Sequence, residues 1–473
     1  MMKLAPYPEY RETGETWFKN VPAHWKTLPL CAVARTKSIT NCVDRELLSV
    51  YLDLGVIRFS DVKEKRTNAT SEDLSKYQAV DPGDFVLNNQ QAWRGSVGVS
   101  KYSGIVSPAY LVLEVHSELY PDYANVLFRD RKMVNQYLVS SKGVGSIQRN
   151  LYWPHLKRAT VAIPPVDEQV RIAKVVKSKA AQINKFIRNK RRLIELLKEQ
   201  KQNVINQAVT RGLDPKVNFK PSGVEWIGDI PEHWDARRLR TLAAVRASGV
   251  DKNTNEDEVP VMLCNYVDVY KNDRITAAID FMKATATPEE IRAFELKAGD
   301  VIITKDSESW DDIAIPTFVP ETIPGVVCAY HLALIRPFSG EIEGEFLFRA
   351  FSSDPVADQF RIAATGVTRF GLAQGAIKGA FFPLPPLEEQ RAIIAHINEK
   401  CAEISQAISR AEREIELMRE YRTRLISDVV TGQVDVRGIE VPEVADEELL
   451  ALEEDTADAD DVIDDEGDMD ETD

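Results

Sequence analysis

The chain has 473 residues, a formal net charge of −15 and five scattered cysteines. This length predicts two or three domains, each large enough to bury a core. No apolar run is long enough to span a membrane, no signal peptide opens the chain, and cysteines without close pairs are typical of a reducing compartment. We therefore expect a cytoplasmic protein and exclude the membrane and disulfide-rich secreted classes.

Near its start the chain contains a segment that it later repeats. Residues 14–25 read GETWFKNVPAHW, and residues 223–234 read GVEWIGDIPEHW, 209 residues later. A second pair of motifs, PPVDEQ from Pro164 and PPLEEQ from Pro385, lies 221 residues apart. These spacings are too long for a solenoid repeat and indicate two whole modules related by a pseudo-two-fold axis.

Two blocks of dissimilar sequence, residues 26–163 and 235–384, lie between the repeated motifs. Each block mixes strand-like and helical segments and contains a Gly-Asp turn followed by a short apolar strand. In the first block this strand leads into NNQQAWRGS (88–96), where four amides precede a tryptophan and an arginine. Amide and guanidinium groups can pair with base edges in DNA, so DNA contact and an ordinary polar loop are both open interpretations. The corresponding loop of the second block is TKDSESWDD (304–312).

A second pair of loops precedes the long helical segments, GVGSIQRNL (143–151) and ATGVTRFGL (364–372). Both combine glycine, a hydroxyl and an arginine, a set that suits phosphate or base contact. The Gly-x-Gly of the first lacks the spacing of a dinucleotide-binding fingerprint. From the four loops, the residues that we expect to contact DNA are Asn88, Asn89, Gln90, Gln91, Arg94, Ser146, Gln148, Arg149, Lys305, Ser307, Ser309, Thr368 and Arg369.

The segments 164–210 and 385–431 are predicted to form two long helices. Each opens with two prolines and then contains neither proline nor glycine. Their apolar residues recur with a period near 3.5, which is typical of a coiled-coil seam, and a two-fold axis would pair the helices antiparallel. The predicted seam residues are Ile172, Val176, Ile183, Ile187, Ile194, Leu197, Val204, Ile393, Ile397, Ile404, Ile408, Ile415, Met418 and Leu425.

The last residues, 441–473, contain 17 acidic and no basic side chains. Such a composition cannot offset the entropy of ordering, so we expect a disordered, solvating tail. An alternative is a tail that competes with DNA for a basic surface, of which the segment 164–210 is the most basic part.

Catalytic and metal-binding motifs are absent from the sequence. We find no phosphate-binding P-loop, no nucleophile elbow and no aminomethyltransferase signature. The six histidines lack metal-ligand spacing. His24 and His233 lie in the repeated Pro-x-His-Trp turns, where packing is a more common role than catalysis. We therefore predict no catalytic residue and no metal site.

Taken together, the repeated turns, helix openings and Gly-Asp strand starts resemble the specificity subunit of type I restriction–modification enzymes over residues 7–437. The resemblance implies a mixed α/β fold, with two globular target recognition domains separated by two long antiparallel coiled-coil helices. It also implies that each domain reads one half of a bipartite target in double-stranded DNA. The helices would set the spacing and dock modification subunits, two per chain, and restriction subunits. S-adenosylmethionine, ATP and Mg²⁺ would bind those partner subunits, and this chain would bind no cofactor.

Two other classes of protein remain as alternatives, a two-headed scaffold and an independent DNA-binding regulator. A scaffold would show no salt-sensitive DNA binding, and a regulator would bind specific DNA without partners. The predicted organisation is a first cap and recognition domain (1–163), the first long helix (164–210), a linker with the second cap and recognition domain (211–384), the second long helix (385–431) and a C-terminal segment (432–473).

Overall fold

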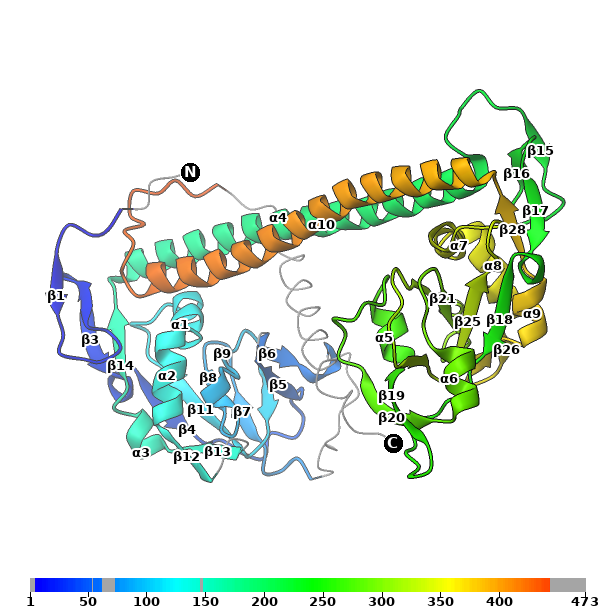
Figure 1. Ribbon diagram of the computed structural model, residues 1–473. Coiled ribbons are helices and arrows are strands. Elements are labelled where there is room, and N and C mark those ends of the chain that lie inside the picture. Colours follow the sequence, from blue (N-terminus) through cyan, green and yellow to red (C-terminus); the bar gives the residue numbers. More distant parts are fainter. Residues whose placement is uncertain (1–4, 53, 62–72, 145–147, 443–473) are drawn as a thin grey trace. The chain divides into compact units, whose positions relative to one another are not determined.

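The computed structural model describes residues 5–52, 54–61, 73–144 and 148–442, and it confirms the predicted fold class (Figure 1). The chain divides into two compact units, residues 1–191 with 413–473 and residues 192–412. Each unit contains one globular α/β domain and a stretch of both long helices. The predicted disorder of the acidic tail falls on residues 443–473, outside the described residues.

The first unit is built on a four-stranded antiparallel sheet. Its strand order is β4 (Ala34–Lys37), β11 (Tyr110–Val115), β8 (Phe85–Asn88) and β9 (Val97–Val99). The smaller strand pairs are β1 (Tyr10–Glu12) with β2 (Asn20–Pro22), β3 (Lys26–Pro29) with β14 (Thr160–Ile163), β5 (Leu48–Tyr51) with β6 (Gly55–Arg58), β7 (Gln78–Val80) with β10 (Gly104–Val106), and β12 (Ser141–Val144) with β13 (Gln148–Leu151). The short helices are α1 (Pro121–Phe128), α2 (Arg131–Val139), α3 (Trp153–Leu156) and the 3-10 turns η1 (Leu30–Ala32), η2 (Phe59–Asp61) and η3 (Ala92–Arg94).

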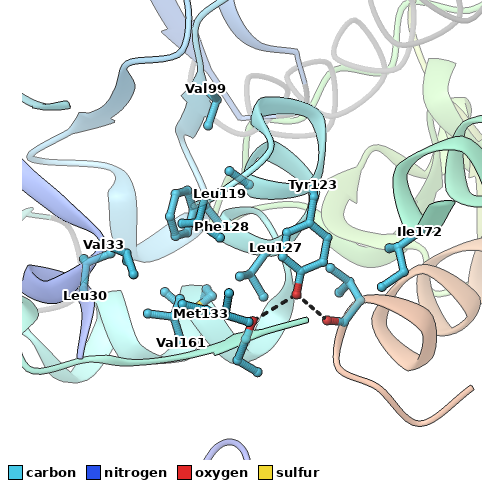
Figure 2. Close-up of a cluster of buried hydrophobic side chains, with 14 of the residues drawn as sticks. Leu30, Val33, Val99, Leu119, Tyr123, Leu127, Phe128, Met133, Val161 and Ile172 are labelled. Atoms are coloured by element: carbon cyan, nitrogen blue, oxygen red, sulfur yellow. Dashed lines mark hydrogen bonds between the residues drawn. The ribbon is translucent and has the colours of Figure 1, made fainter. Parts of the chain in front are cut away.

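In the core of the first unit, α1 packs against the sheet and against the long helices (Figure 2). The ring of Phe128 stacks on Phe85 of β8 with centroids 4.2 Å apart. The buried Tyr123 hydroxyl lies 3.0 Å from the carbonyl oxygen of Ala162 and 3.3 Å from that of Val430. One tyrosine therefore joins α1 to β14 and to the end of the second long helix.

The second unit repeats this sheet with the same strand order. The strands are β18 (Ala243–Ala247), β25 (Leu332–Pro337), β21 (Val301–Thr304) and β23 (Pro316–Phe318). The pair β17 (Asp235–Arg238) and β28 (Phe381–Leu384) matches β3 and β14, and the pair β15 (Phe219–Pro221) and β16 (Asp229–Pro231) matches β1 and β2. The repeat in the sequence is thus a repeat of topology.

The remaining elements of the second unit lie in its divergent block. They include a three-stranded sheet of β20 (Met282–Ala286), β19 (Val259–Cys264) and β24 (Val326–Cys328), and a small sheet of β22 (Asp306–Ser307), β27 (Phe370–Gly371) and β26 (Thr365–Gly366). The helices are α5 (Tyr266–Lys271), α6 (Pro288–Phe294), α7 (Gly344–Phe351), α8 (Asp354–Ala363), α9 (Gln374–Gly379) and the 3-10 turn η4 (Leu239–Thr241). The four-stranded sheet and the strand pairs common to both units therefore carry different sets of further elements.

The long helices are α4 (Val166–Arg211) and α10 (Leu387–Val430), of 46 and 44 residues. In each unit they pack side by side and antiparallel (Figure 1). In the first unit Ile172 of α4 shares a core with Leu425 of α10, and in the second Ile205 shares one with Ile393. The Lys190 ammonium lies 2.6 Å from the Glu414 carboxylate across the first pairing. The predicted seam is accordingly buried at Ile172, Val176, Ile183, Ile187, Ile393, Ile397, Ile404, Ile415 and Leu425, and half-buried at Ile194, Leu197, Val204, Ile408 and Met418.

The two motifs that repeat in the sequence are the two sides of one contact. In the first unit, the buried Glu168 carboxylate at the start of α4 accepts a hydrogen bond from the Trp25 indole at 3.0 Å and lies 2.8 Å from His24 Nε2. The Tyr7 hydroxyl also donates to Glu168. A carboxylate in the first turn is favoured by the helix dipole, and here it ties the cap to the helix. His24 has the structural role that its turn predicts.

The second unit forms the same contact without a tyrosine. Glu389, at the start of α10, accepts from the Trp234 indole at 3.0 Å and lies 2.9 Å from His233 Nε2. A glycine closes the other side of each tryptophan. A Cβ atom on Gly212, which follows α4, would lie 3.1 Å from the Trp234 ring, and one on Gly432, which follows α10, would lie 3.1 Å from the Trp25 ring. Each tryptophan therefore joins the start of one long helix to the end of the other.

Candidate nucleic-acid interface

The two loops predicted separately in the first block meet in the structure. The backbone N–H of Leu151 donates to the Asn89 carbonyl at 3.0 Å, which joins the loop after β8 to the hairpin β12–β13. Two guanidinium groups lie over the ring of Trp93 in η3, with Arg94 4.8 Å and Arg149 5.5 Å from a ring centroid. Cation–π contacts of this kind restrict a guanidinium group before a ligand binds. The first unit thus presents two oriented arginines on one tryptophan.

Several residues predicted in this loop have distinct local roles. The Asn88 side chain accepts the Gln90 backbone N–H at 3.2 Å, which shapes the turn. The Trp93 indole donates to the Gln90 carbonyl at 2.9 Å and fixes the ring. The side chains of Gln90 and Arg94 are exposed and that of Gln91 is half-buried, so these three can reach a ligand.

On the hairpin, the expected contact at Ser146 and the side chain of Gln148 lie outside the described residues. Arg149 is described, and its Nε is buried without a hydrogen-bond partner among the described residues. A buried donor without an acceptor is unfavourable, and an incoming base or phosphate oxygen would satisfy it.

The corresponding loops of the second block also meet. Strand β22 pairs with β27, and the Leu372 backbone N–H donates to the Lys305 carbonyl at 2.9 Å. On this surface His331 Nδ1 lies 2.6 Å from the Asp306 carboxylate, and Arg369 Nη2 lies 3.4 Å from His331 Nε2. His331 has a φ of 68°, which is uncommon for a residue other than glycine. An unusual backbone conformation at this position is a reason to consider a functional role.

The residues predicted to contact DNA in the second block differ in exposure. Thr368 and Arg369 are exposed. The Lys305 ammonium lies 3.6 Å from the Asp306 carboxylate, Ser307 is buried, and the Ser309 hydroxyl donates to Asp311. Thr368 and Arg369 are therefore the best placed of these five for a ligand.

Three tyrosines around this surface, Tyr266, Tyr270 and Tyr330, were missed by the sequence analysis, whereas Trp310 belongs to the loop 304–312 identified there. Tyr266 and Tyr270 of α5 stack with centroids 5.8 Å apart, and Trp310 and Tyr330 are exposed. Burial raises the pKa of Tyr266, while a hydrogen bond to Ser307 opposes that rise. A hydrogen bond to Asp312 raises the pKa of Tyr270. The only sequence signal was the i, i+4 spacing of two tyrosines, which by itself predicts only a helix face.

The described residues contain no cluster of three or more side chains suited to a metal ion. Among the helices of the described segments, none has the length and apolar character needed to cross a membrane.

The fold and the paired loop surfaces define a two-domain protein with a shared antiparallel helical pair. No family model matches the chain. Among its curated relatives is the putative type I restriction enzyme MjaX specificity subunit of Methanocaldococcus jannaschii, 22% identical over 465 residues that cover 92% of this chain and 100% of the relative. Another is the type I restriction enzyme StySPI specificity subunit of Salmonella potsdam, 21% identical over 397 residues that cover 80% of this chain and 82% of the relative.

Solved structures share the fold. One comes from a study of complex assembly and conformational transition in a type I R-M system, with a TM-score of 0.63 and 15% identity over 88% of this chain and 99% of that chain. The HsdS subunit from Thermoanaerobacter tengcongensis has a TM-score of 0.51 and 16% identity over 88% of this chain and 98% of that chain. These comparisons confirm the resemblance found in the sequence: the chain is a relative of type I specificity subunits along nearly its whole length. The relatives are named as specificity subunits of their enzymes, in agreement with a non-catalytic chain.

Proposed function

We propose that this chain is the DNA-recognition subunit of a type I restriction–modification enzyme and that it reads a bipartite sequence in double-stranded DNA. The observation that carries the proposal is the joined loop surface of each unit. The sheets beneath these surfaces have the same strand order, whereas the side chains on them differ. A shared frame with two different polar surfaces is the arrangement needed to read two different half-sites.

In the first half-site, Arg94 and Arg149 would bind guanine edges or phosphates. A guanidinium group pairs bidentately with the O6 and N7 atoms of guanine, and its stacking on Trp93 limits the freedom lost on binding. Gln90 and Gln91 would bind adenine through their amides, and the Asn89 backbone holds the hairpin in place.

In the second half-site, Arg369 would be the principal cation and Thr368 a hydroxyl donor. Asp306 fixes the His331 ring by the 2.6 Å contact, and the ring in turn faces the Arg369 guanidinium. The acidic groups of the loop 304–312, Asp311 and Asp312, disfavour close approach of a phosphate. Base contact is therefore the main role of this surface.

The long helices would set the spacing between half-sites and dock the partner subunits. We propose recognition domains at 1–163 and 211–384, with helices 164–210 and 385–431 between them. Because a pseudo-two-fold axis presents the same docking surface twice, two modification subunits would bind per chain. Those adenine methyltransferase subunits, with S-adenosylmethionine, and the restriction subunits, with ATP and Mg²⁺, would supply the chemistry, in the cytoplasm.

The test is to co-express the chain with the products of its neighbouring genes and to map methylated adenines on plasmid DNA. A bipartite motif with a fixed spacer of unspecified bases is expected. Specific binding by the isolated chain without methylation in the complex would favour a regulator. Absence of salt-sensitive DNA binding in both preparations would favour a protein scaffold and refute the proposal.

A further inference from the structure

The second unit contains an open pocket of about 370 Å³ that none of the proposed DNA contacts lines. It lies where α4 and α10 meet α7 and the turn after α5. The side chains around it that bear on its chemistry are Lys201, Asp273, Arg274, Arg349, Asn398 and Ser405. Its volume is many times the roughly 30 Å³ that a water molecule occupies in the liquid, so a four-oxygen anion has room to enter.

Arg349 is the unusual member of this group. Arg349 is only 8% exposed, and no carboxylate among the described residues forms an ion pair with its guanidinium group. Nη2 donates to Asn398 Oδ1 at 2.7 Å, whereas Nε is buried without a hydrogen-bond partner in the described part of the chain. Burial lowers the pKa of Arg349, and the negative charges of Glu345 and Asp273 oppose this effect without reversing it. A buried cation normally requires a paired anion.

Glu345, which lies close to this group of side chains, already contacts other partners. The Glu345 carboxylate pairs with the Arg274 guanidinium and accepts a hydrogen bond from Asn398 Nδ2 at 2.9 Å. Lys201 forms no ion pair or hydrogen bond within the described residues. Among the described residues that line the pocket or pair with its lining, the three cations Lys201, Arg274 and Arg349 are matched by two carboxylates, Asp273 and Glu345, which leaves one positive charge in excess.

The corresponding place in the first unit is closed by a hydrogen bond. A shift of 221 residues relates Lys201 to Arg422 and Asn184 to Ser405. In the first unit, Arg422 Nη1 donates to Asn184 Oδ1 at 2.9 Å. Lysine and serine at the same two positions of the second unit lack the guanidinium and amide groups of that bond, and the pocket lies between them. Among the described residues, the second unit thus has this pocket where the first unit has the Arg422–Asn184 hydrogen bond.

We propose that this pocket binds a single oxyanion, a phosphate or a carboxylate group, through the Lys201 ammonium and the Arg349 guanidinium. Such a group would compensate the buried Arg349 charge and accept from the unpaired cations by charge-assisted hydrogen bonds. Two sources have this chemistry, a free phosphate ion and an acidic side chain of a bound protein subunit. The inference does not depend on DNA reading, since the recognition loops contribute no residue to it.

Equilibrium dialysis of the full chain against radiolabelled inorganic phosphate, with ionic strength held constant by chloride, tests the site. One saturable site per chain is expected. Lys201→Met and Arg349→Met should each weaken phosphate binding by about tenfold or more, because each removes one charge-assisted partner. Lys198→Met, at an exposed position one turn earlier on α4, removes the same charge and should leave the affinity unchanged.

Two further measurements identify the source of the bound oxyanion. Displacement of phosphate by acetate would extend the site to carboxylates. Loss of phosphate binding when the chain is purified with its partner subunits would assign the site to a partner's acidic side chain, and retention would assign it to a free ion. Absence of saturable binding to the wild-type chain, or equal affinity of wild type and Lys201→Met, overturns the inference. Because Lys201→Met leaves the buried Arg349 intact, this variant tests the oxyanion site even if Arg349→Met fails to fold.

Discussion

Replacing Glu168 by alanine tests whether the contact between cap and helix stabilises the fold as its geometry implies. In the wild-type first unit, the buried groups Tyr7 and Trp25 both donate to this carboxylate. In Glu168→Ala both donors lose their acceptor, at a cost of about 1–3 kcal/mol for each. The second unit offers a matched control, because within the described segments Glu389 accepts from one buried donor, Trp234.

We therefore expect Glu168→Ala to destabilise its unit by roughly 1–3 kcal/mol more than Glu389→Ala destabilises the other. The loss of negative charge in the first helical turn is common to both variants and cancels in the comparison. Hydrogen exchange measured by mass spectrometry reports the units separately through peptides of α1 and α7, and 1.4 kcal/mol corresponds to a tenfold change in the opening equilibrium.

A second substitution makes this test specific for the tyrosine hydroxyl. Tyr7→Phe should stabilise the Glu168→Ala background, because it removes a buried hydroxyl that has lost its acceptor, and should destabilise the wild-type chain. Equal effects of Glu168→Ala and Glu389→Ala, or further destabilisation by Tyr7→Phe in the variant, would refute the reasoning.

Three other predictions concern DNA reading, spacing and pH. Arg94→Ala and Arg149→Ala should each cost about 1–3 kcal/mol in discrimination at the first half-site only. Asn88→Ala should lower stability without changing base preference, and methylation mapping of the three variants checks both statements. Deleting Ile183–Asn189 together with Ile404–Arg410 keeps the seam in phase and shortens each helix by about 10 Å, so the spacer in the methylated motif should shrink by about 3 bp while both half-sites stay the same. An unchanged spacer contradicts a spacing role for the helices. Burial and the Glu168 carboxylate raise the pKa of Tyr7 above its ordinary value of 10.0, so the neutral hydroxyl stabilises the first unit below pH 10 and this stability is lost as pH rises further. Tyr7→Phe should reduce this loss of stability by up to about 1.4 kcal/mol per pH unit, measured by unfolding at alkaline pH. If the stability of Tyr7→Phe falls with pH as steeply as that of the wild type, the prediction is wrong.

The paired loop surfaces show where inference from sequence reaches its limit. Three of the four loops were recognisable from their glycines, amides or arginines, because turn chemistry and polarity are local properties, and the loop 304–312 was found by its place after the corresponding strand. That the loops join in pairs was not recognisable, because strand pairing such as β22 with β27 links Asp306 to Gly371 and Ser307 to Phe370, 65 and 63 positions apart. His331 carried no local signal at all, since its role depends on Asp306, 25 residues earlier, and on Arg369, 38 residues later.

The sequence by itself determined the internal repeat, the two long helices and their seam. These features follow from periodicity and helix capping, which act over one or a few turns and are therefore written in short segments. Only the tertiary structure decided that Trp25 contacts Glu168, that Arg94 and Arg149 both lie over Trp93, and that Arg349 is buried without an ion pair to a described carboxylate. In each case the energy depends on desolvation and on groups brought together from distant segments, and a sequence read along the chain contains neither.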